Sequence, residues 1–242
     1  MALDNQTAVV FGGTSGIGFA IARRLSGAGA RVVVTGRDRD KLQRTLAELG
    51  GANERVRGEL FDARDRQALD AFFARTGPID HLVLSLGGGE GAGEFLQLDL
   101  QVLRRGFEDK FWPQVEAAQA SLATLRPGGT VTFITGMAAR LSSPGIAGLA
   151  AINGALEAMI ENLARELGPV RVNAVSPGVI DTPWWDRFPA EIRDGIFRQQ
   201  AETLPVGRMG RADDVAQAAQ FLIESRYMTG TVIECDGGMH LV

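Results

Sequence analysis

The sequence predicts a single α/β domain built on a doubly wound parallel sheet of about seven strands, with helices on both faces. Short runs of β-branched and apolar residues alternate along the chain with longer segments of helical periodicity. Most of these runs are largely apolar, as expected for parallel strands that are buried on both faces, whereas RVRGEL at 55–60 carries three charged residues. No internal repeat, low-complexity segment or linker divides the 242 residues, so one domain spanning 1–242 accounts for the whole chain.

Seven segments are expected to form the strands of this sheet. They cover, in chain order, residues 7–11, 31–35, 55–60, 80–86, 130–135, 170–175 and 231–235. Apolar residues with helical spacing follow the first strand (Ile17, Ile21, Leu25), the second (Leu42, Leu46, Leu49) and the fifth (Leu149, Ile152, Leu156, Met159, Leu163, Leu167). Right-handed crossovers between successive strands convert this alternation into a doubly wound sheet.

The composition argues against several classes of function. The net charge of −4 argues against a nucleic-acid-binding surface as the main function. One cysteine, Cys235, and two histidines, His81 and His240, leave no cysteine cluster or histidine-rich set for a metal, so no metal site is expected. The first residues lack a basic segment followed by a long apolar run, and no stretch is long enough to span a membrane. We therefore expect a cytoplasmic protein that does not act at a membrane.

A glycine-rich turn follows the first strand, in the segment VVFGGTSGIGFAIARRL. Gly12, Gly16 and Gly18 have G-x-x-x-G-x-G spacing between this strand and an amphipathic helix that begins near Ile17. Glycine permits positive φ angles and lets the backbone come close to a pyrophosphate, whose charge is favoured at a helix N-terminus. The segment therefore indicates a dinucleotide-binding site, although a tight turn without a ligand is the alternative.

Two long loops follow predicted strands on the side where open α/β sheets bind ligands. One is GGGEGAG at residues 87–93, and the other is SPGVIDTPWWDRFPAE at residues 176–191. Trp184, Trp185 and Phe188 predict an apolar lid over a pocket for a small-molecule substrate, within a loop at about residues 178–205. A contact between subunits is the alternative explanation for these three aromatic residues.

Together, these features resemble the short-chain dehydrogenase/reductase family over essentially the whole chain. The similar segments are FGGTSGIG, with Phe11 where the family usually has Thr, FDARD at 61–65, RVNAVSPGVIDTP at 171–183, GRADDVAQAAQFL and MTGTVIECDGG. The resemblance implies a Rossmann fold, a nicotinamide cofactor, an adenine contact from Asp62, and a homodimer or homotetramer. The cofactor-binding residues expected from the resemblance and the glycine-rich turn are Gly12, Thr14, Ser15, Gly16, Ile17, Gly18, Arg37, Asp62, Ala63, Leu86, Gly87, Asn153, Pro177, Gly178, Ile180 and Thr182.

The end of the second strand predicts which cofactor is preferred. An acidic side chain there would bind the ribose diol of NAD(H) and repel a 2′-phosphate, but this position is Gly36 and the next residue is Arg37. A guanidinium can pair with the 2′-phosphate and stack on adenine, so NADP(H) is favoured over NAD(H). The alternative is that Arg37 is a solvated loop charge, and Asp38 beside it weakens the expectation.

The four positions that the resemblance identifies as catalytic carry different residues in this chain. The family's Tyr and Lys, four residues apart, fall on Leu149 and Asn153, and its Ser falls on Gly136. The family's Asn position falls on Lys110. A small shift of the alignment does not restore these groups. The one tyrosine is Tyr227, near the C-terminus, and no lysine occurs after Lys110. Loss of a well-placed acid or base typically lowers a rate by about 10²–10⁴.

Lys110 and Asn153 are candidates to replace the lost groups. Lys110 is expected either to point into the site, where it would hold the ribose or stabilise an oxyanion, or to lie on a helix surface. Its neighbours Phe107, Phe111 and Trp112 would lower the pKa of its ammonium by desolvation. Asn153 keeps the ability to hydrogen-bond the ribose.

Other polar residues near these positions have weaker support. Thr135 is expected either to act in catalysis or to be a strand-end hydroxyl with its hydrogen bonds satisfied. Loop residues that would face the substrate, or would simply be solvated, are Arg140, Ser142 and Ser143. His81 and Cys235 are expected to be structural, Cys235 as a small core residue.

These features leave three hypotheses for the function. The cofactor segment favours an NADP(H)-dependent oxidoreductase that transfers hydride to or from a small organic carbonyl, imine or activated alkene by a non-standard site. An activated alkene or an iminium would need less protonation by the enzyme than a ketone does. Loss of the four catalytic residues also fits an inactive NADP(H)-binding pseudoenzyme or sensor, and non-redox chemistry in the same pocket is the third hypothesis.

Overall fold

The seven apolar runs form a central sheet, near their expected bounds except at β5, which begins earlier. The computed structural model describes residues 2–50 and 55–242. The strands are β1 (Thr7–Phe11), β2 (Arg31–Gly36), β3 (Val56–Leu60), β4 (Ile79–Leu84), β5 (Leu125–Ile134), β6 (Arg171–Pro177) and β9 (Val232–Cys235). Neighbouring strands are parallel, in the order β3-β2-β1-β4-β5-β6-β9. The predicted doubly wound sheet is therefore confirmed.

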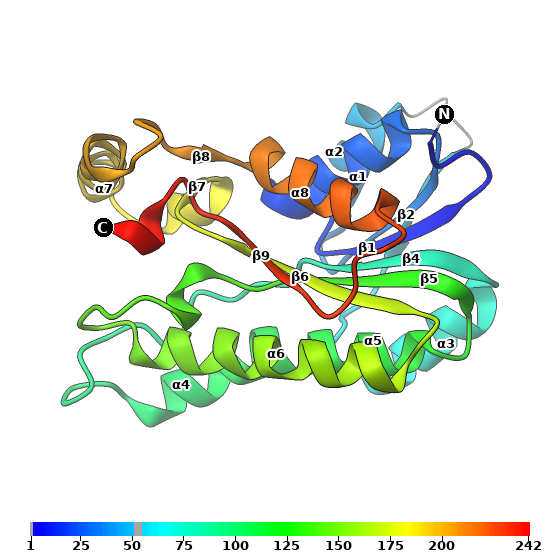
Figure 1. The fold of residues 1–242 in the computed structure, drawn as a ribbon, viewed down its shortest axis with the longest axis horizontal. Coiled ribbons are helices and arrows are strands. Elements are labelled where there is room, and N and C mark those ends of the chain that lie inside the picture. Colours follow the sequence, from blue (N-terminus) through cyan, green and yellow to red (C-terminus); the bar gives the residue numbers. More distant parts are fainter. Residues whose placement is uncertain (1, 51–54) are drawn as a thin grey trace.

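Helices cover both faces of this sheet (Figure 1). One face is covered by α1 (Gly16–Gly27), α2 (Arg39–Glu48) and α8 (Ala212–Glu224). The other face is covered by α3 (Arg66–Thr76), α4 (Leu100–Gly106), α5 (Trp112–Ser121) and α6 (Ala147–Glu166). Between α4 and α5 the helix continues through a π-helical turn, η1 (Phe107–Phe111). Among the described residues, no helix combines the length and the apolar character that a membrane span requires.

Several short elements gather at the carboxyl end of the sheet. A pair of two-residue strands, β7 (Ile180–Asp181) and β8 (Gly210–Arg211), forms a second small sheet that the sequence patterns did not predict. The expected substrate loop at about 178–205 contains β7, the 3-10 turn η3 (Pro183–Arg187) and α7 (Ala190–Thr203). Two further 3-10 turns are η2 (Met137–Ala139) and η4 (Met239–Leu241).

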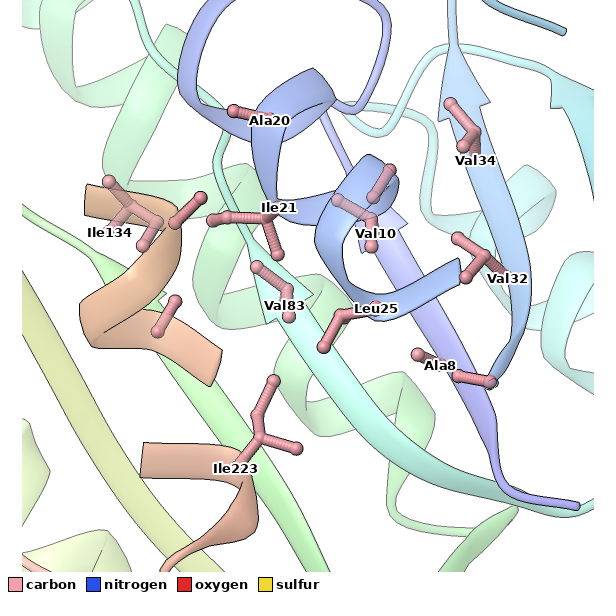
Figure 2. Packing of buried hydrophobic residues seen from close by; sticks show 14 of the residues in the cluster. Ala8, Val10, Ala20, Ile21, Leu25, Val32, Val34, Val83, Ile134 and Ile223 are labelled. Carbon is pink, nitrogen blue, oxygen red and sulfur yellow. The ribbon is translucent and has the colours of Figure 1, made fainter. Parts of the chain in front are cut away.

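Apolar side chains from the sheet and from α1 and α8 form one of the two main cores (Figure 2). Ile21 on α1 is 0% exposed and belongs to the same cluster as Val10, Val83 and Ile134. The second core, on the opposite face, contains Phe11, which packs edge-on against Phe72 with ring centroids 6.0 Å apart. A core position thus accounts for the phenylalanine that precedes the glycine-rich turn.

We expect the substitution Ile21→Val to lower the free energy of unfolding by about 0.5–1.5 kcal/mol, because it removes a methylene group from a fully packed position. Urea unfolding should show a lower midpoint with an unchanged slope. Ile192→Val is the matched control, because Ile192 on α7 is 51% exposed, and it should change the stability by less than about 0.5 kcal/mol. Equal losses in the two variants would contradict the assignment of Ile21 to the core.

The chain order reverses at β1, and this reversal positions the site. β2 and β3 lie on one side of β1, while β4, β5, β6 and β9 lie on the other. The loops that leave β1 and β4 therefore diverge and open a crevice at the carboxyl ends of the strands, where doubly wound sheets bind ligands.

Candidate functional site

A cleft of about 1220 Å³ follows the carboxyl ends of the strands. Its walls come from the loops after β1 to β6 and from α6. Of the sequence-predicted cofactor residues, all except Gly18 line this cleft: Gly12, Thr14, Ser15, Gly16, Ile17, Arg37, Asp62, Ala63, Leu86, Gly87, Asn153, Pro177, Gly178, Ile180 and Thr182. Residues distant in the sequence are thus brought together at one edge of the sheet.

The glycine-rich turn depends on positions where a side chain would not fit. A Cβ atom on Gly12, whose φ is +68°, would lie 2.4 Å from the carbonyl oxygen of Ser85. A Cβ atom on Gly18 would lie 2.3 Å from the carbonyl oxygen of Gly12. Gly18 therefore lets α1 pack against the turn, while Gly12 and Gly16 leave bare backbone facing the cleft.

Cationic side chains line the end of the cleft beside β2. Arg37 follows the strand, and Lys41 and Arg44 face the cleft from α2. Asp38, the acidic neighbour of Arg37 that weakened the expectation of NADP(H), caps α2. Its carboxylate accepts a hydrogen bond of 2.9 Å from the Lys41 backbone N–H. Part of its acceptor capacity is therefore committed to the helix.

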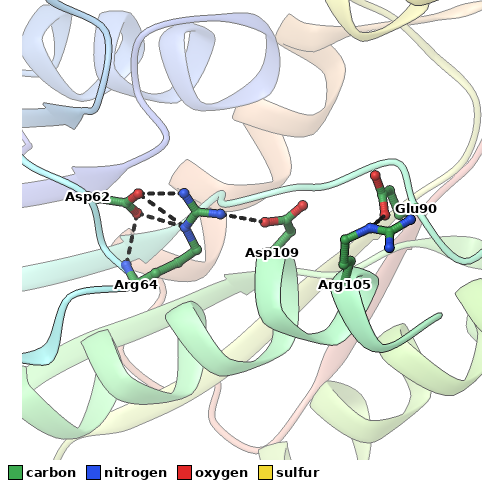
Figure 3. A network of polar contacts seen from close by, with 5 residues as sticks. All are labelled: Asp62, Arg64, Glu90, Arg105 and Asp109. Carbon is green, nitrogen blue, oxygen red and sulfur yellow. Dashed lines mark hydrogen bonds and ion pairs between the residues drawn. The ribbon is translucent and has the colours of Figure 1, made fainter. Parts of the chain in front are cut away.

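Asp62 is held by an arginine that the sequence analysis did not single out (Figure 3). The Arg64 guanidinium donates to both Asp62 carboxylate oxygens, with the shortest contact at 2.6 Å, and also to Asp109 at 3.1 Å. These hydrogen bonds hold the pKa of the Asp62 carboxyl below its usual range. The expected adenine contact is thus an ionised carboxylate shared with Arg64.

Lys110 points into the cleft from the π-helical turn, and not outward from the helix surface. Its Nζ donates to the backbone carbonyl of Thr135 at 2.8 Å and to Oδ1 of Asn153 at 2.7 Å. Burial lowers the pKa of the Lys110 ammonium to about 8, and the negative charge of Glu157 opposes that shift. The structure therefore brings the three candidates Lys110, Thr135 and Asn153 into one group.

One face of α6 forms the floor of this group. Leu149, Asn153 and Glu157 are spaced four residues apart, so they lie on the same side of the helix. The amide of Asn153 donates from Nδ2 to the carbonyl oxygen of Leu149 at 2.8 Å. A Cβ atom on Gly136 would lie 3.2 Å from Oδ1 of Asn153, so the absence of a side chain at Gly136 leaves room for that amide.

Glu157 is the main residue of this region that the sequence analysis missed. Its carboxylate accepts from the Thr135 hydroxyl at 2.8 Å and pairs with Arg140 at 2.9 Å. Arg140 also pairs with Glu234 on β9, so its guanidinium is held by two carboxylates. The Thr135 hydroxyl is likewise committed to Glu157. The signal available in the sequence was an acidic residue two turns after Leu149, on the same helix face.

The substrate loop meets the loop after β4 at the opposite wall of the cleft. Nε1–H of Trp184 donates to the carbonyl oxygen of Gly88 at 3.0 Å. The ring centroid of Trp184 lies 4.8 Å from that of Trp185 and 5.5 Å from that of Phe188. Trp184 and Trp185 line the cleft, together with the apolar residues Met137, Leu141, Val179 and Met239.

The remaining sequence candidates lie elsewhere. Ser142 and Ser143 are exposed. His81 is buried and contacts Thr130 Oγ1 at 2.9 Å, and burial lowers the pKa of its imidazole to about 4. Cys235 is half-buried at the end of β9, where burial raises the pKa of its thiol.

One group with suitable spacing for a metal occurs in the described part of the chain: Glu234, Asp236 and His240. Its members are engaged with protein partners, since His240 contacts Asp236 at 2.7 Å and Glu234 pairs with Arg140. This arrangement gives no positive support for a metal, and none is assigned.

Comparisons with known proteins agree with this geometry. A family model described as Enoyl-(Acyl carrier protein) reductase matches residues 12–240. The human protein Dehydrogenase/reductase SDR family member 4 is 32% identical over 251 residues, which cover 98% of this chain and 88% of that protein. A 3-oxoacyl-(acyl-carrier-protein) reductase of Chlamydia trachomatis is 30% identical over 258 residues, which cover 98% of each chain. A crystal structure of a small-chain dehydrogenase in complex with NADPH has a TM-score of 0.86 and 36% identity, and the match covers 99% of this chain and 100% of that one.

Proposed function

The chain belongs to the short-chain dehydrogenase/reductase family, and on that premise we propose that it is an NADP(H)-dependent oxidoreductase with a non-standard catalytic site. The proposed reaction is hydride transfer to or from a small organic carbonyl, imine or activated alkene. One observation carries the proposal: the Lys110 ammonium lies 2.7 Å from Asn153 Oδ1 inside the glycine-lined cleft. Assembly as a homodimer or homotetramer stays a prediction.

The cleft fits a dinucleotide because backbone lines the end where a pyrophosphate would lie. Gly12 and Gly16 present main-chain atoms there, and the N-terminus of α1 would favour the negative charge. Arg37 would pair with a 2′-phosphate, and a preference for NADP(H) is supported by the similar small-chain dehydrogenase that was crystallised with NADPH. When bound, NADPH supplies the hydride, and the residues of this chain bind the substrate and supply the proton.

We assign the proton donation to Lys110. Burial lowers the pKa of its ammonium to about 8, which makes Nζ a stronger acid than an exposed lysine and keeps it mostly protonated at neutral pH. Nζ would donate to the substrate atom on which negative charge develops. Leu149 and Gly136, at the positions where the family has Tyr and Ser, offer no side-chain donor, so no other group at those two positions competes for this role.

Asn153 and Thr135 would hold the donor in place without taking part in proton transfer. Both accept a hydrogen bond from Nζ of Lys110, through a side-chain amide oxygen and a backbone carbonyl. An ammonium has three protons, so two such bonds leave the third for a substrate. The apolar wall of Trp184, Trp185 and Met137 favours a substrate whose remaining part is uncharged and apolar.

Substitution of Arg37 by glutamate is expected to weaken NADPH binding by a factor of about 10–150, since a hydrogen bond to a charged group contributes about 1.5–3 kcal/mol. NADH binding should be retained, because NADH lacks the 2′-phosphate that a carboxylate repels. Calorimetry with each cofactor measures both constants. Arg39→Glu reverses the same charge on α2 outside the cleft lining and is the control. Loss of NADPH and NADH binding to equal extents in Arg37→Glu would contradict this assignment.

A single-turnover assay tests the function itself. Protein loaded with NADPH is mixed with a panel of ketones, aldehydes, cyclic imines and enones, and NADPH oxidation is followed by absorbance. Oxidation above background with one class supports the proposal and identifies the substrate class. Tight NADPH binding, seen as stabilisation of the fold, without any oxidation would instead favour the pseudoenzyme hypothesis.

A further inference from the structure

The carboxylate of Glu157 is buried beside the candidate catalytic group, and the proposed reaction does not by itself explain why. Its side chain is only 9% exposed. Burial of a charged group is costly unless the group is paired and hydrogen-bonded. Both of its oxygens have partners: Oε1 accepts from the Thr135 hydroxyl at 2.8 Å, and Oε2 pairs with Arg140 at 2.9 Å.

Thr135 connects this carboxylate to Lys110. The Thr135 hydroxyl binds Glu157, while the carbonyl oxygen of the same residue accepts from Lys110 Nζ at 2.8 Å. Thr135 follows directly after β5, and its backbone N–H is held by the carbonyl of Val175 at 2.9 Å. Thr135 alone therefore connects Glu157 to Lys110, and a change at Glu157 would alter the position of the Thr135 carbonyl oxygen that orients the ammonium.

We propose that Glu157 is a positioning residue for Lys110. Glu157 fixes Thr135 and places a buried negative charge near the Lys110 ammonium. This inference deepens the proposed function and rests on it for the catalytic meaning of Lys110, but not for the physical coupling between the two groups. Arg140 adds a third group to this arrangement: it pairs with Glu157 and with Glu234 on β9, so it connects the middle of α6 to the last strand.

The electrostatic part of this role is favoured by how the surrounding charges are paired. The negative charge of Glu157 raises the pKa of Lys110 against the effect of burial. On the other side of the turn, Asp109 pairs with Arg64 at 3.1 Å and Glu90 pairs with Arg105 at 2.7 Å (Figure 3). Of the further charged side chains in this region, Asp62 also pairs with Arg64, Glu108 on the Lys110 turn is exposed, and Arg187 lies over the Trp184 ring. The charged residues Arg37, Asp38, Lys41, Arg44 and Glu48 line the cleft from the end of β2 and from α2.

The test uses the two lysines of the chain, Lys41 and Lys110. Protein labelled with ¹³C-lysine and free of cofactor gives two ε-carbon signals, and Lys41→Arg identifies that of Lys110. In Glu157→Gln the titration midpoint of Lys110 is expected to fall below about 8, its value with Glu157 present, because the neutral amide no longer attracts the ammonium. Glu161→Gln removes the same charge one turn later on an exposed position of α6 and should leave the midpoint unchanged.

A second variant gives the opposite sign and covers the case in which Glu157→Gln does not fold. Arg140→Gln removes the cation that offsets Glu157, so the midpoint of Lys110 should rise. Midpoints that stay at the parent value in the folded Glu157→Gln protein, or in Arg140→Gln, would overturn the proposal. The measurement needs neither cofactor nor substrate, so its failure is distinct from failure of the proposed reaction. If the reaction is also demonstrated, its high-pH limb should shift with the midpoint.

Discussion

Replacement of Lys110 by methionine is expected to lower the rate of NADPH oxidation in a single turnover by a factor of about 10²–10⁴. Methionine keeps much of the length of the side chain but has no proton to donate, so negative charge developing on the substrate would have to be protonated by water. NADPH binding should be much less affected, because the glycine-rich turn and Arg37 are untouched. Stopped-flow absorbance measures the rate, and calorimetry measures the binding.

The pH dependence provides a second measurement for the same variant. Lys110 donates as the ammonium, which is present below its pKa of about 8 and is lost above it. The rate of reduction by the parent protein should therefore fall as the pH rises through about 8, and Lys110→Met should lack this limb. Lys41→Arg is the control, because Lys41 lines the end of the cleft beside β2, on α2. A parent-like rate and pH profile in Lys110→Met would exclude Lys110 as the acid.

The main sheet was predictable because its signal is local. Parallel strands that are buried on both faces need largely apolar runs, and such runs can be read without knowledge of their partners. The signal is weakest for the edge strand β3, whose residues are half-buried or exposed. The pair β7 and β8 was missed because each strand is two residues long, at Ile180–Asp181 and Gly210–Arg211, and so carries no periodicity. Their pairing depends on the path of the substrate loop, which local patterns do not specify.

The same distinction separates the two halves of the site. The glycine-rich turn is one contiguous segment, so its residues could be predicted together. The network at the other end is formed by residues far apart in sequence: Lys110 and Asn153 are separated by 43 positions, and Arg140 and Glu234 by 94. Lys110 was a candidate from the sequence, but the sequence did not decide whether its side chain points into the cleft or outward from a helix surface. Sequence reasoning did not single out Glu157, because an acidic residue on an amphipathic helix is usually solvated.

Exchange of Lys110 and Asn153 is the second change with a large expected effect. Lys110→Asn leaves two amides and no ammonium, whereas Asn153→Lys places two ammonium groups where a 2.7 Å contact now joins an ammonium and an amide. Each single variant should therefore lose activity. The double variant Lys110→Asn/Asn153→Lys has one ammonium and one amide again, in the order that resemblance to the family implies. Residues in direct contact show coupling energies of about 0.5–3 kcal/mol, so its rate should exceed the product of the single effects by a factor of about 2–150.

Single-turnover rates and NADPH affinities of the four proteins in this cycle separate two explanations. If what matters is an ammonium between η1 and α6, the double variant recovers activity although each side chain now projects from the opposite helix. If the position of the donor on η1 is itself required, the double variant is no faster than Lys110→Asn alone, and the assignment of the proton to Nζ of Lys110 gains support at the expense of a purely electrostatic role. Recovery together with a high-pH limb that moves with the relocated lysine would show that the contact between the two residues, more than the identity of either, defines the site.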